Sequence, residues 1–184
     1  MNRFRVWMLC ILTAALLAFA AAASAEETTI VASGECGRGP NTTVNDDLTW
    51  TLDSEGLLTV RGEGPMYNGS AMPQWYSYRE QIKSIKIEEG VTSVGYYAFD
   101  GCINLTIVDL PSSLTKIGTH AFSGCTSLTQ IKLPKGIKSI DWCAFENCTN
   151  LKQVEMATGI TIIGSYAFRN CTSLTQINLP TGVT

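Results

Sequence analysis

Histidine, closely spaced cysteines and charge are all scarce in this 184-residue chain. His120 is the only histidine, no two cysteines follow the C-x-x-C spacing, and 16% of residues are charged, with a formal net charge of −3. Nucleophilic catalysis needs a base and zinc sites need clustered ligands, so His120 is interpreted as a variable surface or edge position. A mildly acidic, evenly mixed chain also argues against nucleic-acid binding. We therefore predict no enzyme activity, no cofactor, no metal site and no nucleic-acid partner.

One long apolar run contributes much of the 45% hydrophobic content. Residues 6–23 are apolar except for one threonine, Arg3 and Arg5 precede them, and Ala23-Ser24-Ala25 follows. A basic start, an apolar centre and a small-x-small site are typical of a secretory signal peptide; a membrane anchor is the alternative. Residues 1–25 are therefore predicted to be a signal peptide cleaved after Ala25. The protein is then secreted or at the cell surface, without a membrane span, and its charge changes from −3 to −5.

The cysteines indicate a repeat rather than a disulfide framework. Four of them follow one another at a constant 23-residue interval: Cys102, Cys125, Cys148 and Cys171. A single period linking four cysteines marks one position of a repeating unit, in which the thiol behaves as a small buried hydrophobe. Cys143 lies outside this series. It is interpreted as a free thiol or as the partner of Cys148 or Cys36 in a disulfide.

Shifting the chain by this same interval aligns it with itself. The unit is L-x-x-[IV]-x-L-P-x-x-[IL]-x-x-I-G-x-x-A-F-x-x-C-x-x, and full copies cover about residues 87–178. A period of 20–29 residues with L-x-x-L-x-L is the signature of leucine-rich repeats. Residues 73–87 read as a degenerate first rung, and 179–184 as a truncated rung without a polar cap. We expect the chain to be a fragment of a longer array, or else a chain whose last rung is exposed.

Each repeat unit is expected to form one turn, or rung, of a solenoid. Leu105, Val108 and Leu110 point to one side and the residues between them point outward, as in a short strand with one buried side. Pro111 ends this strand, because proline cannot donate to a ladder. No rung can bury its apolar side alone, so the rungs must stack. We predict a β-rich leucine-rich-repeat solenoid of stacked 23-residue repeats with short parallel strands. Gly118 suits a turn with positive φ or a close backbone approach.

Residues 26–72 do not repeat. Apolar residues alternate with polar ones over 48–52 and again over 58–60, with Asp53-Ser-Glu-Gly56 between them. This pattern predicts a β-hairpin. We expect residues 26–72 to contain a leader, loose over 26–40, and a β-hairpin N-terminal cap, with residues 73–184 forming the repeats.

The repeat unit L-P-x-x-I-x-x-I-G-x-x-A-F-x-x-C-x-x-L resembles the BspA-type, or Treponema pallidum-type, leucine-rich repeat. The likeness covers about residues 73–184, and Asp141 departs from it at a glycine position. The family is typical of secreted and surface proteins of gut Firmicutes. The resemblance implies adhesion to a host or microbial surface protein or to extracellular matrix, and no catalytic activity.

The outward strand positions are the candidate binding residues, because solenoids bind through such surfaces. They form two columns: Ser84, Ile107, Gln130, Gln153 and Gln176, and beside them Lys86, Asp109, Lys132, Glu155 and Asn178. We expect this concave strand face to bind a protein; plain solvation of the sheet is the alternative use of these side chains. A second functional hypothesis is a glycan- or cell-wall-binding module that uses the aromatic residues of the cap: Trp50, Trp75, Tyr76 and Tyr78.

Overall fold

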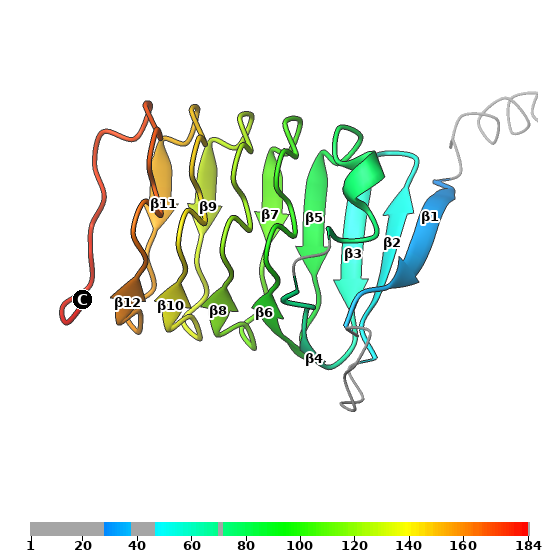
Figure 1. Cartoon of the computed structure of the whole chain (residues 1–184), viewed down its shortest axis with the longest axis horizontal. Helices are drawn as coiled ribbons and strands as arrows, with labels where there is room; N and C mark the ends of the chain where they lie inside the picture. Colours follow the sequence, from blue (N-terminus) through cyan, green and yellow to red (C-terminus); the bar gives the residue numbers. More distant parts are fainter. Residues whose placement is uncertain (1–27, 38–46, 70–71, 184) are drawn as a thin grey trace, which may run out of the picture.

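A computed structural model describes residues 28–37, 47–69 and 72–183. The chain forms a solenoid, with two rows of short strands running along its long axis (Figure 1). The predicted signal peptide, residues 1–25, lies outside the described residues. In the part that the structure describes, no helix is long and apolar enough to cross a membrane.

The first row contains the strands that the repeat predicted. They are β5 (Ser84–Ile87), β7 (Ile107–Asp109), β9 (Gln130–Lys132) and β11 (Gln153–Glu155). β5 pairs with β7 and β9 with β11, and in both parallel pairs the equivalent positions of successive repeats lie opposite each other. Strand pairing is interrupted between β7 and β9, which belong to separate sheets. The predicted solenoid of short parallel strands is confirmed.

The second row lies on the opposite wall. It contains β4 (Gly64–Pro65), β6 (Val91–Val94), β8 (Lys116–Ile117), β10 (Ser139–Ile140) and β12 (Ile162–Ile163), joined in one five-stranded sheet. The pairs are parallel, and Ser139 lies opposite both Lys116 and Ile162. Each rung therefore contributes one short strand to each wall, and the apolar side chains fill the space between the walls.

A β-hairpin covers the N-terminal end of the solenoid, as predicted. β2 (Thr49–Asp53) and β3 (Leu57–Arg61) pair antiparallel, and β3 then pairs parallel with β5. Asp53 Oδ1 accepts hydrogen bonds from the N–H groups of Glu55 (3.0 Å) and Leu57 (2.9 Å), and Gly56 has φ of 88°. This turn chemistry closes the hairpin. A short 3-10 helix, η1 (Tyr76–Tyr78), leads into the first rung.

The prediction of a loose leader over residues 26–40 is wrong for part of that segment. Residues Ile30–Glu35 form β1, which pairs antiparallel with β2 and extends the sheet by one strand. Most of its side chains are exposed or half-buried. The strand is held by backbone hydrogen bonds and has no buried apolar side, so it lacks the alternation that marks a strand in the sequence.

Stacked aromatic rings form the centre of the core. Phe99, Phe122, Phe145 and Phe168 follow each other with ring-centroid distances of 5.1, 5.3 and 5.3 Å. Trp75 continues the stack at 5.8 Å from Phe99. The degenerate first rung thus places an indole where the other rungs place a phenyl ring.

The periodic cysteines are free thiols that also serve as hydrogen-bond donors. The Sγ atoms of Cys125, Cys148 and Cys171 lie 3.2, 3.1 and 3.1 Å from the carbonyl oxygens of phenylalanines in the preceding rungs. All six cysteines in the described part of the chain are unpaired. Burial raises the pKa of Cys102 to about 12. The thiols are therefore more than small hydrophobes, because each of these three donors adds a second hydrogen bond to a carbonyl that already accepts a backbone N–H.

Tight turns give each rung its shape. Gly118 does not have a positive φ; a Cβ there would lie 2.7 Å from the Val94 carbonyl oxygen. The second of the two expected roles, a close backbone approach, is therefore the one that applies. Left-handed backbone occurs instead at two other repeat positions. One position is occupied by Gly101, Gly124, Asn147 and Asn170, and the other by Tyr97, His120, Cys143 and Tyr166.

One exposed carboxylate joins two rungs, and its effect on stability should depend on pH. Glu89 accepts hydrogen bonds from Ser112 N (2.8 Å), Ser112 Oγ (3.0 Å) and Ser113 N (3.1 Å). These bonds, the Ser112 N–H first, lower the pKa of Glu89. The stabilisation is present above the unfolded pKa of about 4.3 and is lost as the pH falls through the lower native pKa.

We predict that Glu89→Gln lowers the melting temperature at about pH 6 and has little effect at about pH 2. Thermal unfolding followed by circular dichroism at both pH values measures the difference. Glu80→Gln is the control, because Glu80 is an exposed acid whose side chain contacts Arg79 of its own rung. An equal loss at both pH values would contradict the role of the Glu89 carboxylate.

Candidate binding face

The structure brings most of the predicted face residues together on the first row of strands. Ser84 lies opposite Ile107 and Lys86 opposite Asp109, and the same pairing recurs between β9 and β11. All ten predicted residues are exposed except Ser84, which is half-buried. The last two, Gln176 and Asn178, lie beyond β11 in a segment without strand structure, where Gln176 Nε2 is 3.3 Å from Asn178 Oδ1.

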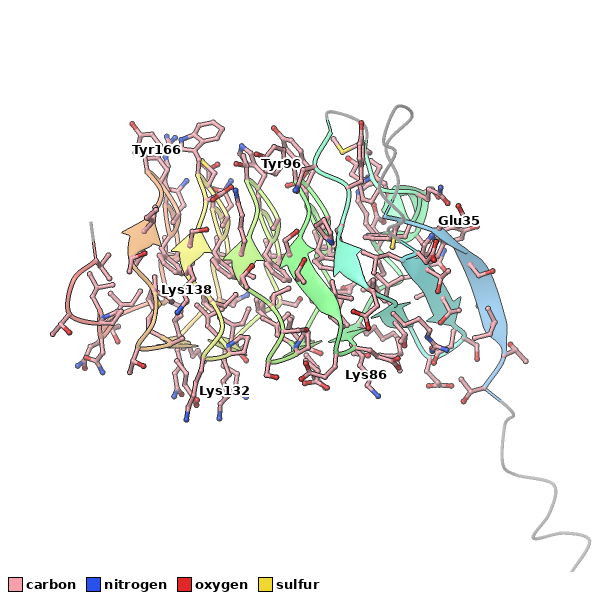
Figure 2. The ribbon with its side chains drawn as sticks, turned by 90° about the horizontal axis from the view of Figure 1, so that it is seen from below. Glu35, Lys86, Tyr96, Lys132, Lys138 and Tyr166 are labelled. Atoms are coloured by element: carbon pink, nitrogen blue, oxygen red, sulfur yellow. The ribbon has the colours of Figure 1, made fainter. Side chains whose placement is uncertain are left out.

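Charges on this face alternate between neighbouring strands. Lys132 Nζ on β9 lies 3.5 Å from Glu155 Oε2 on β11, whereas Lys86 Nζ lies 4.0 Å from Glu88 Oε1 of its own rung. Exposed pairs of this kind contribute little to stability, about 0–1 kcal/mol. Figure 2 shows Lys86 and Lys132 projecting from one side of the solenoid and Tyr96 and Tyr166 from the opposite side. The face therefore carries mixed charge suited to hydrogen bonding with another polar surface.

A hollow lined by both polar and apolar side chains lies within the columns where strand pairing is interrupted. It has a volume of about 240 Å³ and lies between β7, β9 and β11. Ile107 lines it together with Gln130 and Gln153, and 63% of the Ile107 side chain is exposed. The sequence could indicate that Ile107 points outward, but not that a hollow forms, since the hollow depends on the interrupted pairing of β7 and β9.

Comparison with known protein families identifies the type of repeat. The profile of the BspA type leucine-rich repeat region matches six copies over residues 73–184. The chain belongs to the BspA-type leucine-rich repeat family. No curated protein matches it with significant similarity.

Solved structures share this BspA-type architecture. A leucine-rich repeat protein from Eubacterium ventriosum is 26% identical with a TM-score of 0.63, over 83% of this chain and 39% of that protein. The T. pallidum leucine-rich repeat protein is 26% identical with a TM-score of 0.58, over 77% of this chain and 73% of that protein. A leucine-rich cell surface protein from Faecalibacterium prausnitzii is 27% identical with a TM-score of 0.53, over 71% of this chain and 37% of that protein. The chain therefore spans about two fifths of the length of the Eubacterium and Faecalibacterium proteins.

The aromatic cap of this BspA-type chain does not form the sugar platform of the glycan hypothesis. Trp50 and Trp75 are only 3% and 2% exposed, and their rings meet edge to face at 5.7 Å. Tyr78 packs against Trp50, and the Arg79 guanidinium covers Tyr76 at 4.4 Å. The indoles seal the end of the repeat core, so their faces are not available to a ligand.

Exposed aromatic side chains occur instead on the turns of the BspA-type rungs. Trp142 and Tyr166 are 47% and 58% exposed. His120 lies between the stacked ring of Tyr97 (4.9 Å) and the edge-on ring of Trp142 (4.8 Å), and is half-buried. Its predicted place on an edge of the rung is thus correct, but its side chain is packed and is not free in solvent.

Proposed function

We propose that the chain is a secreted or cell-surface protein that binds another protein through the strand face. The observation that carries this proposal is the combination of Ile107, an exposed apolar residue that lines a hollow, with the hydrogen-bonding side chains around it. Interfaces commonly combine an apolar centre with a polar rim. A host or microbial surface protein is the proposed partner class, and adhesion is the proposed role.

Family membership supports the same proposal. The Faecalibacterium protein is described as a cell surface protein, and a stacked-repeat body presents an extended face suited to protein binding. The predicted signal peptide would deliver the chain to the outside of the cell. We propose that the protein acts by binding alone, without catalysis.

Ile107→Ser should weaken partner binding at least tenfold, because it removes the most exposed apolar side chain of the strand face; tenfold corresponds to about 1.4 kcal/mol. Binding to immobilised extracellular-matrix proteins and bacterial surface proteins would be measured by surface plasmon resonance. Replacing Gln130, Gln153 and Gln176 together with alanine should weaken the same interaction. Neither change should lower the melting temperature, since these side chains are exposed.

Ile162→Ser is the matched control. Ile162 is also a strand isoleucine and is 53% exposed, but it lies on β12 in the opposite row. A partner that binds wild type and Ile162→Ser equally, and Ile107→Ser weakly, supports the strand face. Equal binding by all three proteins would show that the binding face is elsewhere.

A further inference from the structure

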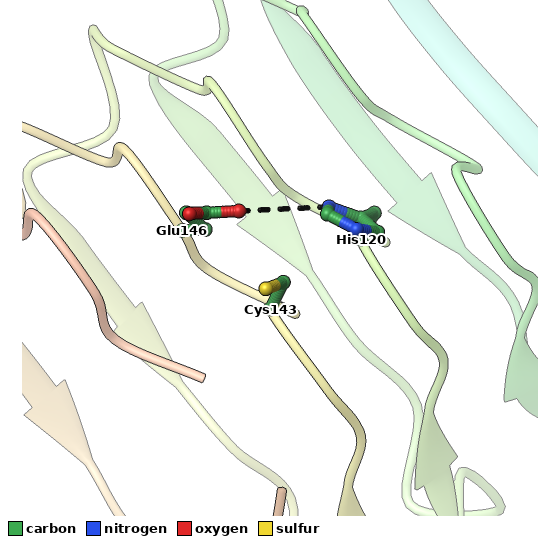
Figure 3. A group of neighbouring side chains, drawn as sticks. All are labelled: His120, Cys143 and Glu146. Carbon is green, nitrogen blue, oxygen red and sulfur yellow. Dashed lines mark ion pairs between the residues drawn. The ribbon is translucent and has the colours of Figure 1, made fainter. Parts of the chain in front are cut away.

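Three side chains with metal-binding atoms converge on the turn edge of the solenoid (Figure 3). Ligand atoms of His120, Cys143 and Glu146 all lie within 4.8 Å of one another, and His120 Nδ1 is 3.9 Å from Glu146 Oε2. Imidazole, thiol and carboxylate are the three side-chain types that bind zinc in proteins. This cluster lies apart from the strand face, so its role is independent of the proposed partner binding.

The repeat itself brings the ligands together. His120 and Cys143 occupy the same position in successive rungs, with φ of 53° and 54°. Cys143 and Glu146 are the two ends of a turn closed by the bond from Glu146 N to the Cys143 carbonyl (3.0 Å). Hydrogen bonds between rungs, such as Gly124 N to the Glu146 carbonyl (2.8 Å), hold these turns in register. The ligands are thus positioned by the backbone ladder of the solenoid.

The surroundings hold the side chains in place. Tyr97 stacks on the His120 ring and Trp142 meets it edge-on. Cys143 is 1% exposed, and the side chains of His120 and Glu146 are 16% and 14% exposed. Arg169 Nη1 lies 3.4 Å from Glu146 Oε1, which leaves Oε2 facing the histidine. A ligating carboxylate held by an outer partner in this way is common in metal sites.

We propose that His120, Cys143 and Glu146 bind Zn²⁺, with a fourth position open to water or a ligand. Tetrahedral zinc with bonds of about 2.0–2.3 Å places its ligand atoms about 3.3–3.7 Å apart. The ligand atoms lie within 4.8 Å of one another, so the cluster must close by up to about 1.5 Å. The metal takes the place of the thiol proton, which is released to solvent. Sulfur and nitrogen ligands favour Zn²⁺ over Ca²⁺ or Mg²⁺. The sequence predicted no metal site because it has a single histidine and no C-x-x-C pair, whereas the cluster combines residues of two neighbouring rungs.

Titration calorimetry with ZnCl₂ on the purified, reduced protein tests the proposal. We expect one zinc per chain, and a melting temperature raised by several degrees at zinc concentrations near 100 times Kd. Co²⁺ in place of Zn²⁺ should give the charge-transfer absorbance of a thiolate ligand. Cys143→Ala and His120→Tyr should each weaken zinc binding at least tenfold and abolish or alter the cobalt spectrum.

The variants are chosen to fold. Tyrosine occupies the His120 position in two sister rungs, as Tyr97 and Tyr166, and circular dichroism of the zinc-free variants checks their structure. Cys36→Ser is the control, because it removes a thiol of the cap and should leave zinc binding unchanged. Zinc should also protect Cys143 of the wild type from alkylation, located by mass spectrometry. Absence of stoichiometric zinc binding, or binding that survives both ligand substitutions, would overturn the proposal.

Discussion

Phe122→Ala is expected to lower the free energy of unfolding by about 3–5 kcal/mol, the range for removing a fully buried phenyl ring. Phe122 is 0% exposed and lies between the rings of Phe99 and Phe145, at 5.1 and 5.3 Å. The cavity would lie mid-solenoid, where the continuous sheet of the second row limits collapse. Urea unfolding followed by circular dichroism measures the loss.

Phe168→Ala tests whether the position in the stack matters. Phe168 is only half-buried, and its ring stacks on Phe145 at 5.3 Å from one side. Its removal should cost about half as much as removal of Phe122, because less apolar area returns to water. If the two variants lose equal stability, the burial of a ring does not determine how much it contributes to stability.

Trp75→Ala should also cost about 3–5 kcal/mol, and here the loss should begin at the cap. Trp75 is 2% exposed, stacks on Phe99, and its Nε1 donates a hydrogen bond of 2.6 Å to the Ala98 carbonyl. The indole thus fills the first rung and satisfies a carbonyl of the next one. Hydrogen exchange measured by mass spectrometry should show faster exchange over residues 84–87 than in the wild type.

Trp75→Phe separates the two contributions of the indole. A phenyl ring keeps the stack on Phe99 but leaves the Ala98 carbonyl without its donor, which costs about 1–3 kcal/mol. The free energy of unfolding of Trp75→Phe should therefore lie between that of the wild type and that of Trp75→Ala. A Trp75→Phe protein as stable as the wild type would show that the hydrogen bond contributes nothing.

Much of the fold could be predicted because each rung repeats the same physical requirements. Leu105, Val108 and Leu110 all point to one side of their strand and need an apolar neighbour, and the constant 23-residue period lets them stack on equivalent residues of the next rungs. The hairpin over 48–60 could also be predicted. Its apolar residues alternate with polar ones on both sides of an Asp-Ser-Glu-Gly turn, and both features indicate two paired strands. The outward position of Ile107 follows from the same alternation.

Features without a periodic apolar signal could not be predicted. β1 is held by backbone pairing, so residues 30–35 carry no pattern of buried side chains. The thiol donors of the periodic cysteines depend on carbonyls of the preceding rung. From the sequence, Trp50 and Trp75 could form either an exposed sugar-binding platform or a buried cover for the end of the core. Which of the two forms depends on how the cap packs on the first rung.

The sequence by itself determined the stacked-repeat architecture and the direction in which the side chains of the first-row repeat strands point, because local alternation and a constant period specify both. The tertiary structure decided where strand pairing is interrupted beside Ile107, and which side chains meet on the turn edge. His120 and Glu146 belong to successive rungs and become neighbours only when those rungs stack. Their meeting depends on the spacing between rungs, on left-handed turns at non-glycine residues, and on the packing of Tyr97 and Trp142 around the imidazole.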